Sequence, residues 1–164
     1  MKKKIVAVVT FLIISITSSN LYGVEAGNTV ISIDEKYGAY CEEIGEQYGI
    51  CPELLEAMIE QESAGQADVV SSGGDIGLMQ VNPKWHRDRI DKLGVISLYD
   101  PYSNILVVAD YLVELFELYG DLPLVLMEYN GSSDAESRYV SGDYTEYAIS
   151  IMERSENLER LHGK

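Results

Sequence analysis

One glutamate in the chain, Glu62, lies where acid–base chemistry is possible. It follows the apolar residues Leu55, Met58 and Ile59 by seven, four and three positions. A helix through this segment therefore places its carboxyl group on the apolar face. A carboxyl group on such a face loses hydration, which raises its pKa, so it can hold a proton near neutral pH and deliver it to a bound molecule.

The same helical phase separates Glu62 from two other glutamates of the segment. Glu56 and Glu60 are four residues apart and stack together on the more polar side of the helix. We therefore expect Glu62 to have the chemical role and Glu60 to be the more exposed of the two. The competing interpretation is structural, with Glu62 satisfied by a buried hydrogen bond.

Other residue types that could do chemistry form weaker patterns. Two cysteines and two distant histidines, His86 and His162, lack the spacing of a zinc site, so we expect no metal and no cofactor. The glycines of residues 73–77 do not follow an apolar strand and lack the spacing of a phosphate-binding loop. Cys41 and Cys51 could form one disulfide across a turn between helices, which the spacing permits without establishing it.

The elements that must position Glu62 are mainly helical. Apolar residues at helical spacing predict helices over residues 34–48, ended by Gly49, then from Pro52 through Glu62, over 83–93, over 101–119, through 122–129 and from about 144 onward. Residues 64–77 are rich in small residues and predict a loop or small hairpin. The composition, 46% hydrophobic and 24% charged, fits a folded globular chain. We expect one mainly α domain over residues 34–158 and a charged tail over 159–164.

The first 26 residues are typical of an export signal. Lys2, Lys3 and Lys4 precede an apolar run over residues 5–16 that is too short to span a bilayer, and cleavage after Ala26 is favoured over retention as an N-terminal anchor. Loss of this segment would change the formal charge from −15 to −17, because three lysines and one glutamate leave. Such an acidic chain is unsuited to nucleic acid or anionic membranes. We expect a monomer that is secreted.

Three segments stand out, which read AMIEQES at residues 57–63, GLMQVNP at 77–83 and EYNG at 128–131. In order and spacing they resemble the signature of the soluble lytic transglycosylase family, which has a lysozyme-like fold. The resemblance implies that the exported chain is secreted or associated with the cell wall. The resemblance implies cleavage of the β-1,4 bond between N-acetylmuramic acid and N-acetylglucosamine in peptidoglycan, with closure of a 1,6-anhydro ring. It also implies that Glu62 is the single catalytic carboxylate, acting first as acid and then as base.

The resemblance carries over further residues by position. It implies that six residues bind the glycan around Glu62, namely Ser63, Ser71, Gln80, Tyr129, Asn130 and Tyr147. Gln80 could instead cap a helix, and Tyr129 could be a core residue. Trp85 and His86 could line a saccharide groove or pack on the surface.

The chain departs from the family pattern at several positions. Asp75 stands where a small alanine is usual, and Glu128 replaces the common alanine before the Tyr-Asn pair. Near the end, Tyr147 best matches the family's tyrosine, which puts Asp143 at the acidic position, although residues 136–140 compete for this match. Two alternative functions stay open: a goose-type-like muramidase that hydrolyses the same bond, and a glycan-binding scaffold without turnover.

Overall fold

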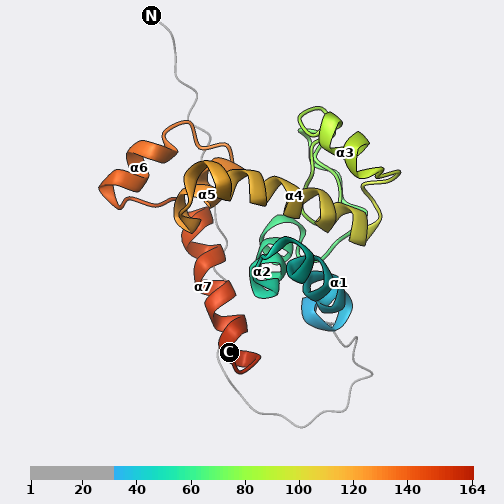
Figure 1. Ribbon diagram of the computed structural model, residues 1–164, viewed down its shortest axis with the longest axis horizontal. Coiled ribbons are helices and arrows are strands. Elements are labelled where there is room, and N and C mark those ends of the chain that lie inside the picture. Colours follow the sequence, from blue (N-terminus) through green and yellow to red (C-terminus); the bar gives the residue numbers. More distant parts are fainter. Residues whose placement is uncertain (1–31) are drawn as a thin grey trace, which may run out of the picture. The chain divides into compact units, whose positions relative to one another are not determined.

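A computed structural model describes residues 32–164, which form seven helices (Figure 1). The predicted leader, residues 1–26, lies outside the described residues. The helices run in the order α1 (Ile33–Tyr48), α2 (Pro52–Ser63), α3 (Arg87–Leu93), α4 (Pro101–Tyr119), α5 (Leu122–Tyr129), α6 (Ala135–Ser141) and α7 (Glu146–Leu161). This confirms the mainly helical fold. None of these helices combines the length and apolar character needed to cross a bilayer.

Helix ends follow the local sequence signals. Ser32 and Glu35 form a capping box at the start of α1, and Gly49 ends this helix in the left-handed conformation. Pro52 occupies the first turn of α2, where its missing N–H is not needed. The Asp100 side chain accepts the backbone N–H of Ser103 at the start of α4.

Helix α2 is the central element and packs mainly against α7 and α1, while α4 covers α1 and α5 (Figure 1). The residues from Glu53 to Ile59 are all buried, so α2 has no polar side over this stretch. The expected polar position of Glu56 was therefore wrong: its side chain is only 2% exposed. Other parts of the fold surround α2 on nearly every side, so none of its faces is exposed to solvent between Glu53 and Ile59.

The loop between α2 and α3 folds back on itself in a small hairpin-like turn. Ile76 forms isolated antiparallel bridges to Val70 and to Val81. Gly77 has a φ of +79°, and a Cβ there would lie 2.4 Å from the carbonyl oxygen of Leu98, so this position requires glycine. The loop or hairpin predicted between helices at about 64–77 is confirmed.

The helices differ from the sequence prediction in three places. The helix expected from residue 83 begins at Arg87, because Asn82 forms a turn in which its carbonyl accepts the N–H groups of Trp85 and His86. The short helix α6 was not predicted. The expected charged tail is not separate: α7 continues to Leu161, and the residues after it fold back onto Glu53. Both cysteines are free, Cys41 buried and Cys51 half-buried.

Candidate active site

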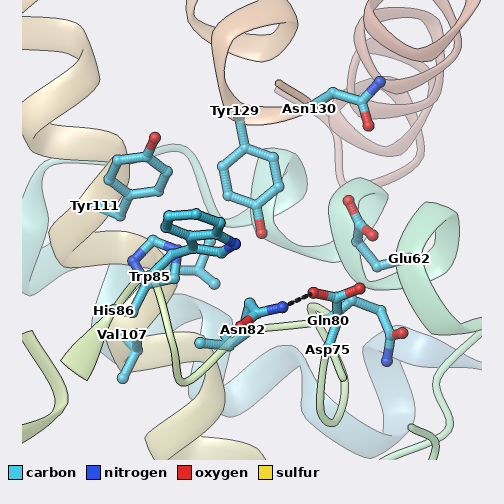
Figure 2. A pocket seen from close by; sticks show the side chains of 12 residues that line it. Glu62, Asp75, Gln80, Asn82, Trp85, His86, Val107, Tyr111, Tyr129 and Asn130 are labelled. Atoms are coloured by element: carbon cyan, nitrogen blue, oxygen red, sulfur yellow. Dashed lines mark hydrogen bonds between the residues drawn. The ribbon is translucent and has the colours of Figure 1, made fainter. Parts of the chain in front are cut away.

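Glu62 lies on the last turn of α2 and faces a cleft of about 250 Å³ (Figure 2). The cleft is bounded by α2, the hairpin loop, the segment before α3, and helices α4 and α5. Its lining residues are Glu62, Asp75, Gln80, Val81, Asn82, Trp85, His86, Val107, Val108, Tyr111, Tyr129 and Asn130. Glu60, only two residues before Glu62, points elsewhere and pairs with Arg154 at 2.6 Å.

The environment of Glu62 favours its protonated form. Burial raises the pKa of this carboxyl, a hydrogen bond from Tyr147 opposes the rise, and the negative charge of Asp75 adds to it. The Tyr147 hydroxyl donates to Oε1 of Glu62 at 2.5 Å. Within residues 32–164, Oε1 is the only Glu62 oxygen with a hydrogen bond, so Oε2 is free to exchange a proton.

Tyr147 contacts Glu62 but is not among the described residues that line the cleft. Burial raises the pKa of this phenol, as do the nearby Tyr129 and Glu62, so it stays protonated and remains a donor. The sequence predicted Tyr147 as a glycan-binding residue. Its hydroxyl contacts the Glu62 carboxylate, and the glycan-binding role stays a prediction.

The GLMQ segment carries Gln80, which lines the floor of the cleft, and the segment is held from two sides. The buried Asn104 of α4 accepts the N–H of Met79 at 2.8 Å and donates to the carbonyls of Ile76 and Leu98. On the other side, the Tyr129 hydroxyl donates to the Met79 carbonyl at 3.0 Å. Tyr129 thus lines the cleft and also ties α5 to the segment below it, and its glycan-binding role stays a prediction.

Gln80 and Asn130 both line the cleft, as expected for residues near the substrate. Gln80 has a φ of +47°, a conformation that non-glycine residues adopt only when their surroundings impose it, and its Nε2 donates to the Gly77 carbonyl. Asn130 ends α5 and is exposed above Glu62 (Figure 2).

Two predicted hydroxyls are used inside the fold. Ser63 is buried and donates to the carbonyl of Ile59 in its own helix. Ser71 donates to Oδ2 of Asp75 at 2.5 Å and accepts the backbone N–H groups of Gly73 and Asp75. Neither Ser63 nor Ser71 is among the described residues that line the cleft. Asp143, the expected acidic position, is exposed and pairs with Arg138 at 3.2 Å.

Asp75 is a cleft residue that the sequence marked only as a departure. Its Oδ1 accepts from Asn82 at 2.8 Å (Figure 2), while its Oδ2 accepts from Ser71. Both oxygens are therefore anchored to the loop, and the carboxylate acts on Glu62 through its charge. The signal that could have found it was the aspartate itself, at a position where the family has a small residue.

Aromatic side chains form the wall of the cleft opposite Glu62. His86 meets the edge of Tyr111 at a centroid distance of 4.8 Å, and Tyr111 lies 5.9 Å from Tyr129. Trp85 projects from this wall with 74% of its surface exposed. Burial and the charge of Arg89 lower the pKa of His86, which keeps the imidazole neutral.

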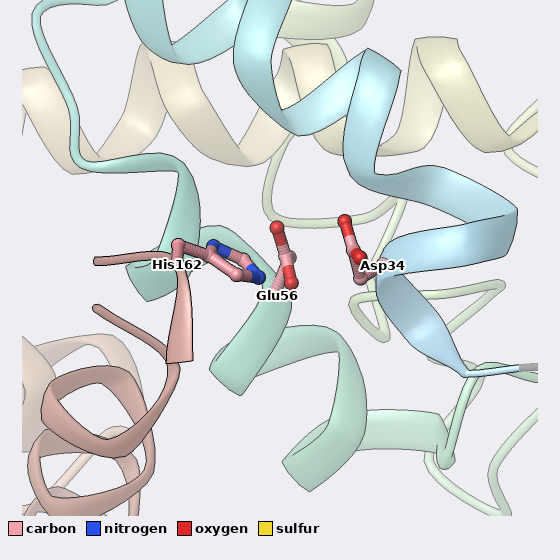
Figure 3. A group of neighbouring side chains, drawn as sticks. All are labelled: Asp34, Glu56 and His162. Carbon is pink, nitrogen blue, oxygen red and sulfur yellow. The ribbon is translucent and has the colours of Figure 1, made fainter. Parts of the chain in front are cut away.

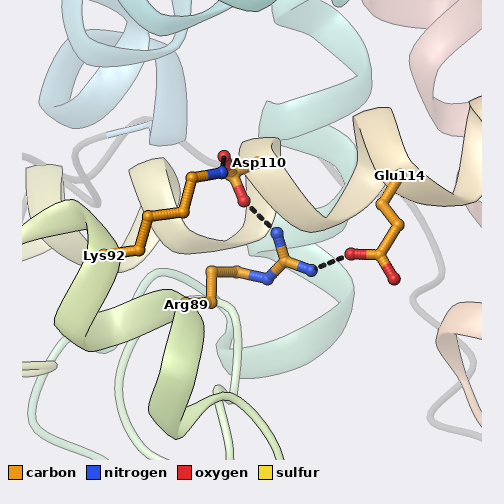
Figure 4. Close-up of polar contacts among 4 residues, drawn as sticks. All are labelled: Arg89, Lys92, Asp110 and Glu114. Carbon is orange, nitrogen blue, oxygen red and sulfur yellow. Dashed lines mark hydrogen bonds and ion pairs between the residues drawn. The ribbon is translucent and has the colours of Figure 1, made fainter.

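A charged cluster fastens this wall to α4 (Figure 4). The Arg89 guanidinium contacts the carboxylates of Asp110 and Glu114, and Lys92 contacts Asp110 at 3.1 Å. Arg89 also lies over the Tyr111 ring at 5.1 Å. Helix α3, and with it Trp85, is held against α4 by these contacts.

Solved structures define the class of fold. The chain superposes on an inactive mutant of the lytic transglycosylase Slt of Pseudomonas aeruginosa with a TM-score of 0.67 at 18% identity, covering 83% of this chain and 26% of that one. The 70 kDa soluble lytic transglycosylase of Escherichia coli also gives a TM-score of 0.67 at 18% identity, covering 80% and 26%. The fold is therefore lysozyme-like.

The sequence comparisons then identify the family. The model of the transglycosylase SLT domain matches residues 39–151, so the chain belongs to this family. A transglycosylase of Enterobacteria phage PRD1 is 35% identical over 88 residues, which are 54% of this chain and 32% of that protein. An endo-type membrane-bound lytic murein transglycosylase A of Klebsiella pneumoniae is 38% identical over 78 residues, which are 43% and 38%. The match thus covers only about a third of these relatives' length.

Proposed function

We propose that the chain cleaves the glycan strands of peptidoglycan as a lytic transglycosylase outside the cytoplasm. The observation that carries this proposal is the environment of Glu62: a half-buried carboxyl group with a raised pKa, facing a cleft and held at one oxygen by Tyr147. The family membership supports the same activity.

The reaction begins with proton donation. Glu62, protonated, gives its proton to the oxygen that links N-acetylmuramic acid to N-acetylglucosamine, and the bond from that oxygen to muramic C1 breaks. The acetamido oxygen of the muramic residue bonds to C1 and holds the positive charge. The Tyr147 hydroxyl donates to the Glu62 carboxylate that remains and stabilises it.

The second step uses the same carboxylate as a base. Glu62 takes the proton from the muramic 6-hydroxyl as O6 bonds to C1, and the bond between C1 and the acetamido oxygen breaks. Glu62 is protonated again and the product ends in 1,6-anhydromuramic acid, with no water consumed. A neutral wall of aromatic residues suits this substrate, because aromatic faces stack on sugar rings.

Asp75 is the observation that favours a second candidate, hydrolysis in the manner of a goose-type muramidase. Inverting glycosidases use a second carboxylate to activate water, and Asp75 lines the same cleft as Glu62. The two hydrogen bonds that anchor Asp75 favour the lyase reaction, since they compete with a water molecule for its oxygens.

Product chemistry separates these activities. Purified peptidoglycan is digested with the protein, and the soluble fragments are treated with borohydride, which reduces a free muramic end but leaves an anhydro end unchanged. The lyase proposal predicts unreduced anhydro ends, from the parent and from Asp75→Asn alike. Reducible ends that disappear in Asp75→Asn would establish the hydrolase, and binding without release of fragments would establish a scaffold.

A further inference from the structure

A second group of ionisable side chains lies near the start of α2, away from the cleft. Asp34 of α1, Glu56 of α2 and His162, which follows α7, each place one ligand atom within 4.8 Å of the others (Figure 3). The three residues come from segments far apart in the sequence, so no spacing pattern could have indicated them.

Glu56 occupies the centre of this group, and no described side chain donates a hydrogen bond to its carboxylate. Its side chain is 2% exposed, and within residues 32–164 its Oε2 has no hydrogen-bond partner. Figure 3 shows the carboxylate directed between the His162 ring and Asp34. A buried carboxylate without a partner is unfavourable. Burial, aided by the charge of Asp34, raises the pKa of Glu56 to about 7.

The ring of His162 is oriented by a second buried glutamate. Nδ1 of His162 lies 2.8 Å from Oε1 of Glu53, which is fully buried and also binds Lys164 at 2.7 Å. The Glu53 carboxylate accepts the Nδ1 proton, and Nε2 lies on the side of Glu56 (Figure 3). This hydrogen bond and the nearby carboxylates raise the pKa of His162, so an ion that binds Nε2 must displace its proton. A carboxylate that holds one nitrogen of a histidine while the other binds an ion is a recurrent arrangement in metal sites.

Glycine at position 38 leaves room for the third member. A Cβ at Gly38 would lie 2.4 Å from Oδ1 of Asp34, so the carboxylate rests against the bare backbone of α1. The α1 helix keeps its ordinary conformation there, and alanine would collide only with the Asp34 side chain.

We propose that Asp34, Glu56 and His162 bind a divalent transition-metal ion of the zinc type, with water completing the coordination. One nitrogen and two carboxylate oxygens are a common protein donor set for zinc, and the imidazole favours zinc over calcium or magnesium. Tetrahedral zinc holds its ligand atoms about 3.4 Å apart, so the two exposed side chains, Asp34 and His162, need to close by about 1 Å. The ion would join α1, α2 and the end of α7, and its role is stability.

The test uses untagged protein freed of metal with a chelator and then titrated with zinc by calorimetry. We expect one zinc ion per chain, and a Tm that rises by several degrees when zinc is present at about 100 times its dissociation constant. Cobalt should give the intense visible absorption of a tetrahedral ion. Calcium and magnesium should bind more weakly than zinc.

Four variants test the ligands and the residues that support them, and a fifth variant is the matched control. Glu56→Gln and His162→Gln should weaken zinc binding by more than the about 10–100-fold typical of an outer-shell residue. His162 is exposed, so its variant folds even if the Glu56 variant does not. Gly38→Ala should weaken binding with all three ligands intact, and Glu53→Gln should cost about 10–100-fold. Glu46→Gln, an exposed change on α1, should bind as the parent does.

Three results would overturn the proposal. The first is the absence of saturable binding at one zinc per chain in the parent. The second is equal affinity in the parent, His162→Gln and Glu56→Gln, which would show that zinc binds at another place. Calcium binding tighter than zinc would likewise refute the assigned donor set.

Discussion

Glu53 in the first turn of α2 and Glu62 in its last turn are both shielded from water, but of these two only Glu62 faces a cleft. Glu62 has Tyr147 at one oxygen and open space beside the other. Glu53 is enclosed by Cys51, His162 and Lys164. Burial therefore prepares a carboxyl group for proton transfer only where a substrate can also reach it.

The pKa values show the same contrast. Burial alone would raise the pKa of Glu53, but hydrogen bonds from Cys51, Lys164 and His162 outweigh it and lower this pKa to about 2. Glu56, one turn further along, has no such donors, and its pKa rises to about 7. Glu62 lies between these cases, since burial raises its pKa while one donor restrains the rise.

The largest expected effect comes from Glu62→Gln. Glutamine keeps the shape and the hydrogen bond to Tyr147 but can neither deliver nor accept the proton, so fragment release should fall by about 10²–10⁴-fold. Thermal unfolding should match or exceed that of the parent, because a partly buried carboxylate is removed. Turnover within tenfold of the parent would show that another group transfers the proton.

A smaller loss, about tenfold, is expected for Tyr147→Phe. The hydroxyl lowers the pKa of Glu62, so its removal raises this pKa further and keeps the acid protonated to higher pH. The alkaline limb of the pH profile of kcat/KM should therefore move upward. Unchanged limbs with a lower rate would indicate a packing role for the ring alone.

Nearer the start of α2, the variant Glu56→Gln should change the stability of the fold. The folded pKa of Glu56 lies above its unfolded value near 4.5, so its favourable contribution is complete below that value and is lost as the pH rises through about 7. In chelator, Glu56→Gln should thus be more stable than the parent at pH 8, by about 1–3 kcal/mol, with the gap closing by pH 5. Urea unfolding at both pH values measures this difference, and a gap of the opposite sign would contradict it.

The smallest effect is expected for Glu60→Gln. Glu60 pairs with Arg154 on the surface, where such pairs contribute at most about 1 kcal/mol. Cleavage should stay within a few-fold of the parent. A loss as large as that of Glu62→Gln would mean that the helical phase assigns the wrong carboxylate.

Helical periodicity predicted most of the fold and the face on which Glu62 lies. It failed for Glu56, because a charged residue is predicted at the surface unless the segments that cover it are known, and those segments are α1 and α7. It also placed the start of the third helix too early, since the turn formed by Asn82 is set by its own hydrogen bonds.

The candidate site was predictable to a similar extent. Family resemblance indicated Glu62, Gln80, Tyr129 and Asn130, and all four line one cleft. It did not reveal that Ser71 anchors Asp75 or that Tyr147 contacts Glu62, because both depend on how distant segments pack. The support that Asn104 gives to the cleft floor is likewise a tertiary property.

The most direct measurement of the central claim is digestion of purified peptidoglycan in water enriched in ¹⁸O, followed by mass spectrometry of the fragments, with the parent and Glu62→Gln compared. Glu62 acting as acid and then base predicts anhydro ends without ¹⁸O from the parent and almost no fragments from the variant. Reducing ends that carry ¹⁸O, or the same anhydro fragments in similar yield from Glu62→Gln, would contradict it.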